Sequence, residues 1–243
     1  MNPVLIIAAV SAETELLAQS LKHGATIDSP GFTVVTGRLG SLPVAVCSSG
    51  IGKINASAAT ATLIERYQPR LVINLGCAGA YAGSNLKIGD LAVADIEILA
   101  DEGVELSRGW LGLDKMGLPS LATAYGDYYN EIPMSYAMTE KVMKFAVHLE
   151  VEVMRGRFAT VSTCSGSTDR GDTVERRFNV IAESMEGAAV ALVCLRYGVD
   201  CIEIRGISNM VGERDIASWD IPRATTNAQR FVVAFLEDNV EAD

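Results

Sequence analysis

The sequence predicts a single α/β domain spanning residues 1–243, built as a three-layer α/β/α sandwich around a central mixed sheet. Three continuously apolar runs, at 4–10, 71–75 and 201–204, are typical of strands that are buried on both faces. Helical segments alternate with the strands along the chain, which indicates a sheet covered by helices. A turn containing Gly, Ser and Pro at 37–43 favours one antiparallel hairpin, so the sheet is expected to be mixed.

Strands and helices are expected at definite places along the chain. The expected strands cover 4–10, 32–38, 44–48, 71–75, 90–98, 156–161 and 201–205. Helices are expected over 12–22, 52–67, 137–149, 172–182, 186–197 and 222–238. The fourth helix is expected to begin at a capping box formed by Asp172 and Glu175. Residues 101–136 are rich in Gly, Tyr, Pro and Met with weak periodicity, and a loop of that length is usually functional or part of an interface.

Composition limits the class of protein. The chain has 243 residues, 49% of them hydrophobic, and a net charge of −10. The negative charge argues against nucleic acid or an anionic membrane as the main partner, because phosphate groups require clustered Lys and Arg. Five cysteines without a Cys-x-x-Cys motif favour a reduced, cytoplasmic protein. The N-terminus lacks a basic leader and no apolar run is long enough to span a membrane, so neither secretion nor a membrane span is expected.

Polar residues gather where predicted strands end. The segment Glu183–Ala189 places Met185 and Glu186 at the start of a helix, and Arg205–Asn209 ends an apolar strand with Arg, Ser and Asn. Open α/β sheets bind ligands at the carboxyl ends of their strands. Such polar groups would be costly in a core without partners. The two segments therefore predict a pocket for a sugar and a heterocyclic base.

Further candidates follow other strands. Ser49–Lys53 offers N–H groups to an anion or a sugar hydroxyl, although a tight turn without a ligand explains it equally well. Gly76–Ala80 either admits a ligand close to the backbone or lets a helix pack closely. Ser165–Thr168 offers hydroxyls, with a surface turn as the favoured alternative. Glu13 follows the first strand, where an acidic residue also complements a helix dipole. All these residues are expected at one edge of the sheet, which favours a shared site.

Several kinds of catalysis are disfavoured. The two histidines, His23 and His148, lie in helical stretches with polar neighbours, so a Ser-His-Asp or Cys-His site is not expected. No His/Cys/Asp cluster has metal-ligand spacing, so neither a metal nor a cofactor is predicted. The remaining candidates are a carboxylate general base, a carboxylate for sugar hydroxyls and an amide for the edge of a base.

Five separate segments carry a resemblance that covers nearly the whole chain. They are Ile6–Ala9 with Glu13, Ser49–Lys53, Asn74–Gly79, Met185–Ala188 and Arg205–Asn209, in the order and spacing of the purine nucleoside phosphorylase/nucleosidase superfamily. The resemblance implies the fold of that superfamily, a small purine nucleoside as substrate and a homo-oligomer of two or more subunits. Within the superfamily the chain is most similar to futalosine hydrolases, through Ala100–Val104, Thr163–Ser167, Gly206–Asn209 and Trp219-Asp220. Methylthioadenosine/S-adenosylhomocysteine nucleosidases are otherwise the most similar group.

The resemblance implies a role for each matching residue. Glu13 matches the carboxylate that orients and deprotonates the attacking water. Arg205 matches the arginine that helps to hold this water. Glu186 matches the carboxylate that binds the ribose hydroxyls, with Met185 beneath the sugar. These roles suit glycosidic cleavage, because its transition state resembles an oxocarbenium ion that needs nearby negative charge and a positioned nucleophile.

The base is expected near Gly79, the backbone of Gly166, Ser167 and Thr168, and Asn209. Asn209 stands where adenosine-cleaving nucleosidases carry Asp. An amide NH₂ suits the O6 acceptor of a 6-oxopurine such as hypoxanthine, and each mismatched buried group would lose about 1–3 kcal/mol. Asn209 therefore favours hypoxanthine over adenine, and it can polarise the leaving base without transferring a proton to it.

These residues predict hydrolysis of the N-glycosidic bond of a 6-oxopurine nucleoside. The favoured reaction is futalosine to dehypoxanthine futalosine and hypoxanthine, in menaquinone biosynthesis. Phosphorolysis is disfavoured, because Lys22 is the first basic residue and Asn74 stands where phosphorylases carry a phosphate-binding arginine. The alternatives are a methylthioadenosine/S-adenosylhomocysteine nucleosidase, a purine nucleoside phosphorylase and a non-catalytic nucleoside-binding protein.

The segment 101–133 is expected over the 5′ side of the substrate, where futalosine carries a benzoate. Its apolar candidates are Trp110, Leu111, Leu113, Met116 and Leu118, and its candidate cations are Arg108 and Lys115. An ordinary interface loop is the alternative.

Overall fold

A mixed sheet of ten strands forms the middle layer of the computed structural model, which describes residues 1–29 and 31–238. Its strands, in spatial order, are β11 (Glu131–Pro133), β6 (Leu91–Leu99), β12 (Val153–Thr160), β13 (Ala182–Ser184), β5 (Leu71–Ala80), β1 (Val4–Ala8), β4 (Leu42–Ser48), β3 (Phe32–Leu39) and β2 (Lys22–Ser29). β14 (Asp200–Met210) pairs with both β5 and β6. β1 runs parallel to β4 and β5, whereas β2, β3 and β4 are antiparallel. The predicted mixed sheet is confirmed, and so is the hairpin at 37–43.

The pairing of five of these strands forms a closed cycle. β14 is parallel to β5 and antiparallel to β6, β6 and β13 both pair with β12, and β13 returns to β5. We call this arrangement of β5, β14, β6, β12 and β13 the closed ring. The ring brings segments that are far apart in the sequence to one place, and the candidate site lies at its edge.

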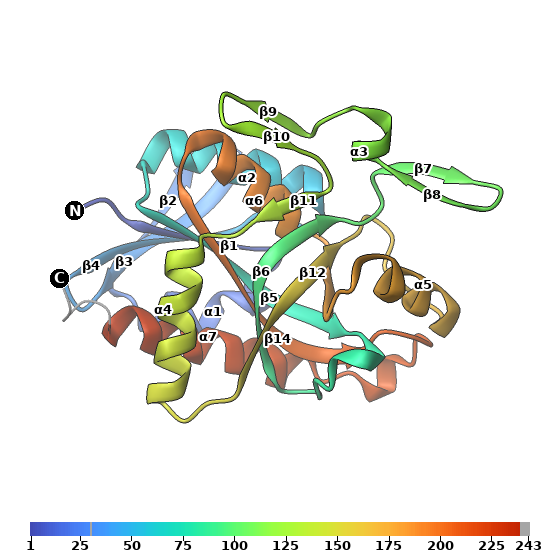
Figure 1. The fold of residues 1–243 in the computed structure, drawn as a ribbon. Coiled ribbons are helices and arrows are strands. Elements are labelled where there is room, and N and C mark those ends of the chain that lie inside the picture. Colours follow the sequence, from blue (N-terminus) through green and yellow to red (C-terminus); the bar gives the residue numbers. More distant parts are fainter. Residues whose placement is uncertain (30, 239–243) are drawn as a thin grey trace.

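Helices cover both faces of the sheet (Figure 1). α2 (Lys53–Tyr67) and α6 (Gly187–Tyr197) lie on one face and pack against each other. α1 (Glu15–Ser20), α4 (Tyr136–His148) and α7 (Ile221–Asp238) lie on the other face, and their apolar residues form a second core with the strands. α5 (Thr168–Phe178) packs beside β12. The expected three-layer α/β/α architecture is therefore confirmed.

One glycine sets the distance between α7 and the sheet. A methyl group at Gly206 of β14 would collide with the backbone of Ala224 in α7. Because only glycine allows this approach, the helix packs directly over the part of β14 that ends in the candidate site. Among the described helices, none has the length and apolar character needed to cross a bilayer.

Two expected helices were wrong in extent. The helix expected over 12–22 is a 3₁₀ turn (Ser11–Glu13) followed by α1, and the chain then enters β2 at Lys22. β2 is an exposed edge strand without apolar alternation, so its sequence carried no strand signal. The helix expected over 172–182 begins at Thr168 and ends at Phe178, before the short strand β13.

The expected capping box at Asp172 was also wrong. Ser167 is the N-cap of α5, because its side chain accepts a hydrogen bond from the N–H of Arg170 at 3.3 Å. Glu175 does not fold back on its own helix. It accepts a hydrogen bond from the N–H of Gly83, which belongs to the 3₁₀ turn Ala82–Ser84, at 2.8 Å.

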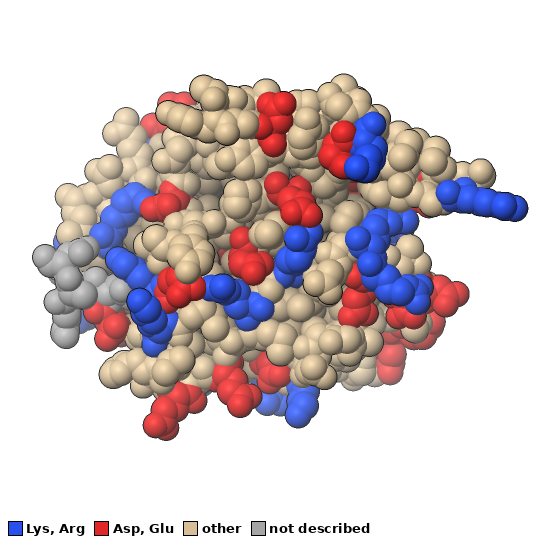
Figure 2. Space-filling view, viewed as in Figure 1, with Lys and Arg blue, Asp and Glu red and all other residues tan. Residues whose placement is uncertain are grey.

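The segment expected as a long loop contains regular structure. Two hairpins, β7 (Gly103–Leu106) with β8 (Gly109–Gly112) and β9 (Leu121–Thr123) with β10 (Gly126–Tyr128), flank the single turn α3 (Leu113–Met116). In Figure 1 the β9–β10 hairpin lies at the top of the molecule, and the β7–β8 hairpin projects from it at the upper right. On the face shown in Figure 2, acidic and basic side chains are interspersed, without a large patch of either sign.

Candidate active site

A cavity of about 290 Å³ lies at the carboxyl ends of β1, β5, β13 and β14. Its lining includes Glu13, Gly79, Met185, Glu186 and Asn209, five of the residues that the sequence predicts to form the site. They come from chain segments separated by up to almost two hundred residues. The prediction that these segments share one edge of the sheet is therefore confirmed by the structure.

Glu13 is held by the backbone on both of its oxygens. The N–H groups of Ala9 and Val10, just after β1, donate to its Oε2 at 3.0 and 3.2 Å. The N–H of Cys77 in β5 donates to its Oε1 at 2.9 Å. The side chain is only 3% exposed. A carboxylate fixed by three donors on the wall of a cavity is more than a solvated charge at a helix start, which was the alternative for this residue.

Arg205 lies beside Glu13, above Gly76. A methyl group at Gly76 would collide with both side chains, so this glycine is required by their close approach. Arg205 is 1% exposed, and its guanidinium donates through Nε to Glu203 at 2.6 Å and through Nη1 to the carbonyl of Cys77 at 3.3 Å. Gly76–Ala80 is not the turn that its composition indicates, because β5 continues through it to Ala80.

Glu186 is the residue that immediately precedes α6. Its Oε1 accepts a hydrogen bond from the N–H of Gly52 at 2.8 Å, and its Oε2 lies 3.6 Å from Nη2 of Arg205. Burial raises the pKa of Glu186 above its usual range, partly offset by the charge of Arg205 and the Gly52 hydrogen bond. Glu186 lines the cavity together with Met185, and its predicted contact with sugar hydroxyls stays a prediction.

The Ser49–Lys53 turn does not offer its charge to a ligand. Its Gly52 N–H is used by Glu186, and Lys53 pairs with Asp101 at 2.6 Å and Glu102 at 3.0 Å. We call this ion-paired group of Lys53, Asp101 and Glu102 the Lys53 cluster. It ties the start of α2 to the residues that follow β6.

Asn209 lies at an irregularity in the pairing of β14 with β5, beside Gly79. Its Oδ1 is 2.8 Å from the hydroxyl of Ser208, and its Nδ2 donates to the carbonyl of Met210 at 3.1 Å. A methyl group at Gly79 would press against Nδ2, so the glycine leaves room for the amide. One N–H of the amide group is thus available toward the cavity.

Gly166, Ser167 and Thr168 lie beyond the cavity lining, because Ser167 and Thr168 begin α5. Their predicted contact with a base stays a prediction. Cys164 and Ser165 line the cavity instead. Ser165 is fixed by Glu183, which accepts from its N–H at 2.8 Å and from its hydroxyl at 2.6 Å, and Tyr81 donates to the same carboxylate at 2.8 Å.

Sequence reasoning missed other lining residues. Glu183 stands two positions before the Met-Glu pair and could have been found by the same strand-end argument. Arg214 and Trp219 also line the cavity, and the guanidinium carbon of Arg214 lies 5.1 Å from the centroid of the Trp219 ring. Nothing in the spacing of Arg214 distinguishes it from an ordinary surface arginine.

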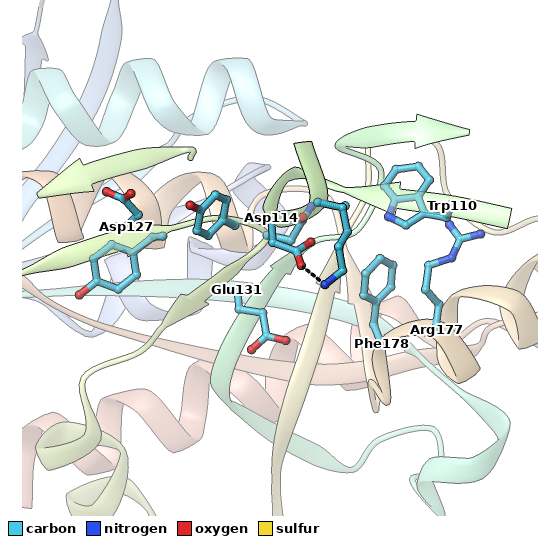
Figure 3. Close-up of a pocket in the computed structure, with 11 residues that line it drawn as sticks. Trp110, Asp114, Asp127, Glu131, Arg177 and Phe178 are labelled. Atoms are coloured by element: carbon cyan, nitrogen blue, oxygen red, sulfur yellow. Dashed lines mark ion pairs between the residues drawn. The ribbon is translucent and has the colours of Figure 1, made fainter. Parts of the chain in front are cut away.

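The expectation for 101–133 is not met within the chain, because none of its residues lines this cavity. Trp110 and Lys115 border a separate cavity of about 500 Å³ with Asp114, Asp127, Glu131, Arg177 and Phe178 (Figure 3). There Arg177 stacks on Trp110 at 4.7 Å, and Lys115 pairs with Asp114 at 3.2 Å. This second cavity is larger, but it lacks the buried carboxylates, Glu13 and Glu186, that line the first.

Known proteins resemble this chain along nearly all of its length. The family model described as the Phosphorylase superfamily matches residues 3–237. A 5′-methylthioadenosine/S-adenosylhomocysteine nucleosidase of Oceanobacillus iheyensis is 32% identical over 239 residues, which cover 94% of this chain and 96% of the relative. A protein of the same name from Bacillus thuringiensis is 29% identical, with coverage of 97% and 98%.

Solved structures of nucleosidases are also similar to this chain over nearly all of its length. The S-adenosylhomocysteine nucleosidase of Streptococcus pyogenes, in complex with 5-methylthiotubericidin, has a TM-score of 0.84 and 27% identity, covering 98% of this chain and 97% of that one. The nucleosidase of Neisseria meningitidis, in complex with methylthio-immucillin-A, has the same TM-score at 24% identity, covers 98% of this chain and 100% of that one, and shows the shared fold.

Proposed function

Since the chain belongs to the phosphorylase superfamily, we propose that it hydrolyses the N-glycosidic bond of a purine nucleoside. The observation that carries this proposal is that Glu13 and Glu186 line one cavity and that the buried guanidinium of Arg205 lies directly behind both carboxylates. Two buried carboxylates and an arginine match what glycosidic hydrolysis needs, namely a base for water and a charged contact for the sugar.

The residues divide the reaction between them. Glu13 accepts a proton from the water that attacks C1′, while the guanidinium of Arg205 beside it holds this water. As the bond from C1′ to the base breaks, its electron pair leaves with the base, and the negative charges of Glu186 and of Glu13, before Glu13 takes the proton, stabilise the cationic sugar. Glu186 accepts hydrogen bonds from the ribose hydroxyls. The base takes its proton from solvent, because the Asn209 amide has no acidic proton to give.

Water is the proposed nucleophile because the cavity has few cations for a phosphate dianion. Among the described lining residues, the one Lys or Arg is Arg214. Arg205 is buried behind the lining beside Glu13, and its Nε is already bound to Glu203. Asn74 is buried and carries no charge. A phosphate without close cations would bind weakly.

Two candidates remain for the base and its 5′ substituent. Asn209 favours a 6-oxopurine, and we propose futalosine, which would give dehypoxanthine futalosine and hypoxanthine in menaquinone biosynthesis. The names of the relatives favour the second candidate, 5′-methylthioadenosine or S-adenosylhomocysteine, and they support it better than they support futalosine. Within the cavity lining, Asn209 is the residue whose chemistry favours the first candidate.

Substrate assays separate these candidates. The protein would be incubated with futalosine, 5′-methylthioadenosine, S-adenosylhomocysteine and inosine, with and without phosphate, and the released base identified by chromatography. Release of hypoxanthine from futalosine supports the first candidate, and release of adenine supports the second. Formation of a sugar 1-phosphate would show phosphorolysis, and release of no base from any of them would refute nucleosidase activity.

The Asn209→Asp variant tests how the base is chosen. If the amide donates to O6, the variant should lose on the order of tenfold in kcat/KM for 6-oxopurine nucleosides, because one buried donor is mismatched. It should gain relative activity on adenine nucleosides. Asn55→Asp, on the exposed side of α2, adds the same charge as a control. An unchanged ratio of the two activities would show that Asn209 does not read the base.

A further inference from the structure

A chain of buried hydrogen bonds runs beneath the candidate site. Glu97 of β6 and Glu203 of β14 are both 0% exposed. On one side, Nε of Arg205 donates to Oε1 of Glu203 at 2.6 Å. On the other side, the N–H of Ala188 donates to the hydroxyl of Thr160 at 2.7 Å, and this hydroxyl donates to Oε2 of Glu97 at 2.6 Å. Every link in this chain therefore lies inside the closed ring or in the first turn of α6.

The two carboxyl groups turn their remaining oxygens toward the same point. Within the described part of the chain, neither Oε1 of Glu97 nor Oε2 of Glu203 has another hydrogen-bond partner. A methyl group at Gly187 would collide with both of these oxygens, so this glycine gives them room. Two facing carboxylates would leave two buried acceptors without a donor and two like charges in a low dielectric. One proton between them removes both costs.

The surrounding groups decide which carboxyl carries the proton. Arg205 contacts Glu203, whereas Glu97 is contacted by the neutral Thr160 hydroxyl. Burial, followed by the negative charge of Glu203, raises the pKa of Glu97 well above its usual range. The other titratable groups that act on this cluster are Glu13, Glu186, Cys194 and Cys201. Glu97 is therefore the acid of the pair, and Glu203 is the anion.

We propose that Glu97 and Glu203 share one proton and that this carboxyl pair positions Arg205 for hydrolysis, a role that rests on the proposed function. Donation then runs from Ala188 to Thr160, from Thr160 to Glu97 and from Glu97 to Glu203. Since Nε of Arg205 is held by Glu203, its buried Nη2 lies 3.6 Å from Oε2 of Glu186 and makes no hydrogen bond among the described residues. Glu97 and Glu203 are positioning residues, because neither lines the cavity.

Infrared spectroscopy tests the shared proton directly. Wild-type protein at neutral pH should show the C=O stretching band of a protonated carboxylic acid, with its characteristic shift in D₂O. Glu97→Gln should remove this band. Glu140→Gln changes a partly exposed carboxylate that pairs with Arg155, and should leave the band in place. A wild-type spectrum that matches that of Glu97→Gln in this region would overturn the shared proton.

Kinetics test the positioning of Arg205. Glutamine at position 97 keeps each hydrogen bond, since its NH₂ donates to Glu203 and its oxygen accepts from Thr160, so Glu97→Gln should keep kcat within a few fold of wild type. Glu203→Gln removes the charged partner of Arg205 and should lower kcat about tenfold, with a smaller change in KM. Equal losses of kcat in the two variants would show that Glu97 is charged. An unchanged kcat in Glu203→Gln would show that Arg205 does not need a charged partner. Either result overturns the proposal.

The two measurements separate this inference from the proposed function. If the protein cleaves no purine nucleoside, the spectrum still reports whether the pair holds a proton. If it turns over a nucleoside but shows no protonated carboxyl band, the carboxyl pair is refuted while the nucleosidase assignment stands. Glu203→Leu, with thermal unfolding measured alongside kcat, serves as a second variant should Glu203→Gln fold poorly.

Discussion

The carboxylate of Glu13 is held in one orientation, in which it can accept a proton from a water in the cavity. Three backbone N–H groups fix its two oxygens, and Arg205 lies against the same glycine. Glutamine in its place would turn an NH₂ group toward at least one of these donors. Glu13→Gln should therefore lower kcat on the order of 10²–10⁴-fold while the protein stays folded.

The measurement is kcat with the best substrate, alongside a circular dichroism spectrum. Glu15→Gln, two residues later at the exposed start of α1, is the matched control and should be fully active. Near-normal turnover by Glu13→Gln would mean that Glu13 is only a structural charge.

The raised pKa of Glu186 predicts how activity depends on pH. Burial raises this pKa, so the carboxylate becomes neutral at a pH above the usual range for glutamate. A neutral carboxyl accepts poorly from ribose hydroxyls, and KM should therefore rise as the pH falls through the raised pKa. The same shift means that the contribution of Glu186 to folding stability is present at low pH and is lost as the pH rises through that value.

A pH profile of kcat/KM checks this prediction. Glu186→Gln should have weaker substrate binding throughout and should lack the acidic limb that belongs to this residue. If wild type and variant have the same acidic limb, another group is responsible for it.

For individual residues, the sequence was sufficient to identify charged side chains that lie directly beside the ends of apolar strands. Glu13, Glu186 and Arg205 are charged residues next to apolar strands, so their position was informative. Glu97 and Glu203 were missed because each lies within a strand whose neighbours are apolar, and their partners come from other strands. The two carboxyls meet beside Gly187 only once β6 and β14 are assembled into the same sheet.

Among the elements, β5 and β14 are longer than their sequences indicate. Their apolar halves were predicted correctly, but Gly76–Ala80 and Gly206–Asn209 have the composition of turns. Both segments stay extended because they pair with each other to their ends. β13 was missed because three residues are too few for a periodic pattern, and pairing with β12 and β5 defines this strand.

The Lys53 cluster links two elements and should contribute to stability. Lys53 and Asp101 are both mostly buried, and Asp101 also accepts from the N–H of Ser162. Lys53→Met removes the cation but keeps an apolar stem, and should lower the free energy of unfolding by about 1–3 kcal/mol. Urea denaturation measures this loss, with Lys141→Met on the exposed side of α4 as control.

The same cluster predicts acid sensitivity. Burial raises the pKa of Asp101, but the hydrogen bonds from Lys53 and Ser162 lower it by a larger amount. The net shift of this pKa is therefore downward. Its contribution to stability is therefore present above its unfolded-state pKa and is lost as the pH falls through the folded-state value. Lys53→Met should show a smaller loss of stability between neutral and acidic pH than wild type. An equal loss in both proteins would contradict the role assigned to the cluster.

At the scale of the whole molecule, the site exists only when the entire sheet is assembled. Its residues come from the segment that follows β1, from β5, from β13 and the start of α6, and from the end of β14. The alternation of strands and helices predicted the layers, but the closed ring could not be read from the sequence. It depends on long-range pairing, which no local pattern reports.

Because the site spans the whole fold, a ligand should stabilise the folded protein as a whole. A nucleoside or a non-hydrolysable analogue at about 100 times its Kd should raise the free energy of unfolding by about 2.7 kcal/mol. Thermal unfolding with and without the analogue measures the effect, and Glu186→Gln should reduce it at the same concentration. A midpoint that does not respond to any purine nucleoside would argue against the proposed ligand class.

The cysteines of this chain give the cavity a natural attachment point for a dye. Cys164 is exposed and lines the cavity, whereas Cys47, Cys194 and Cys201 are buried. Burial raises the pKa of the other lining thiol, Cys77, to about 12, so this thiol stays protonated. Burial and the charge of Glu183 also raise the pKa of Cys164, and coupling to a maleimide would therefore be favoured by mildly alkaline buffer. A fluorophore on that one sulfur would report occupancy of the cavity optically, in the unmutated protein and in real time.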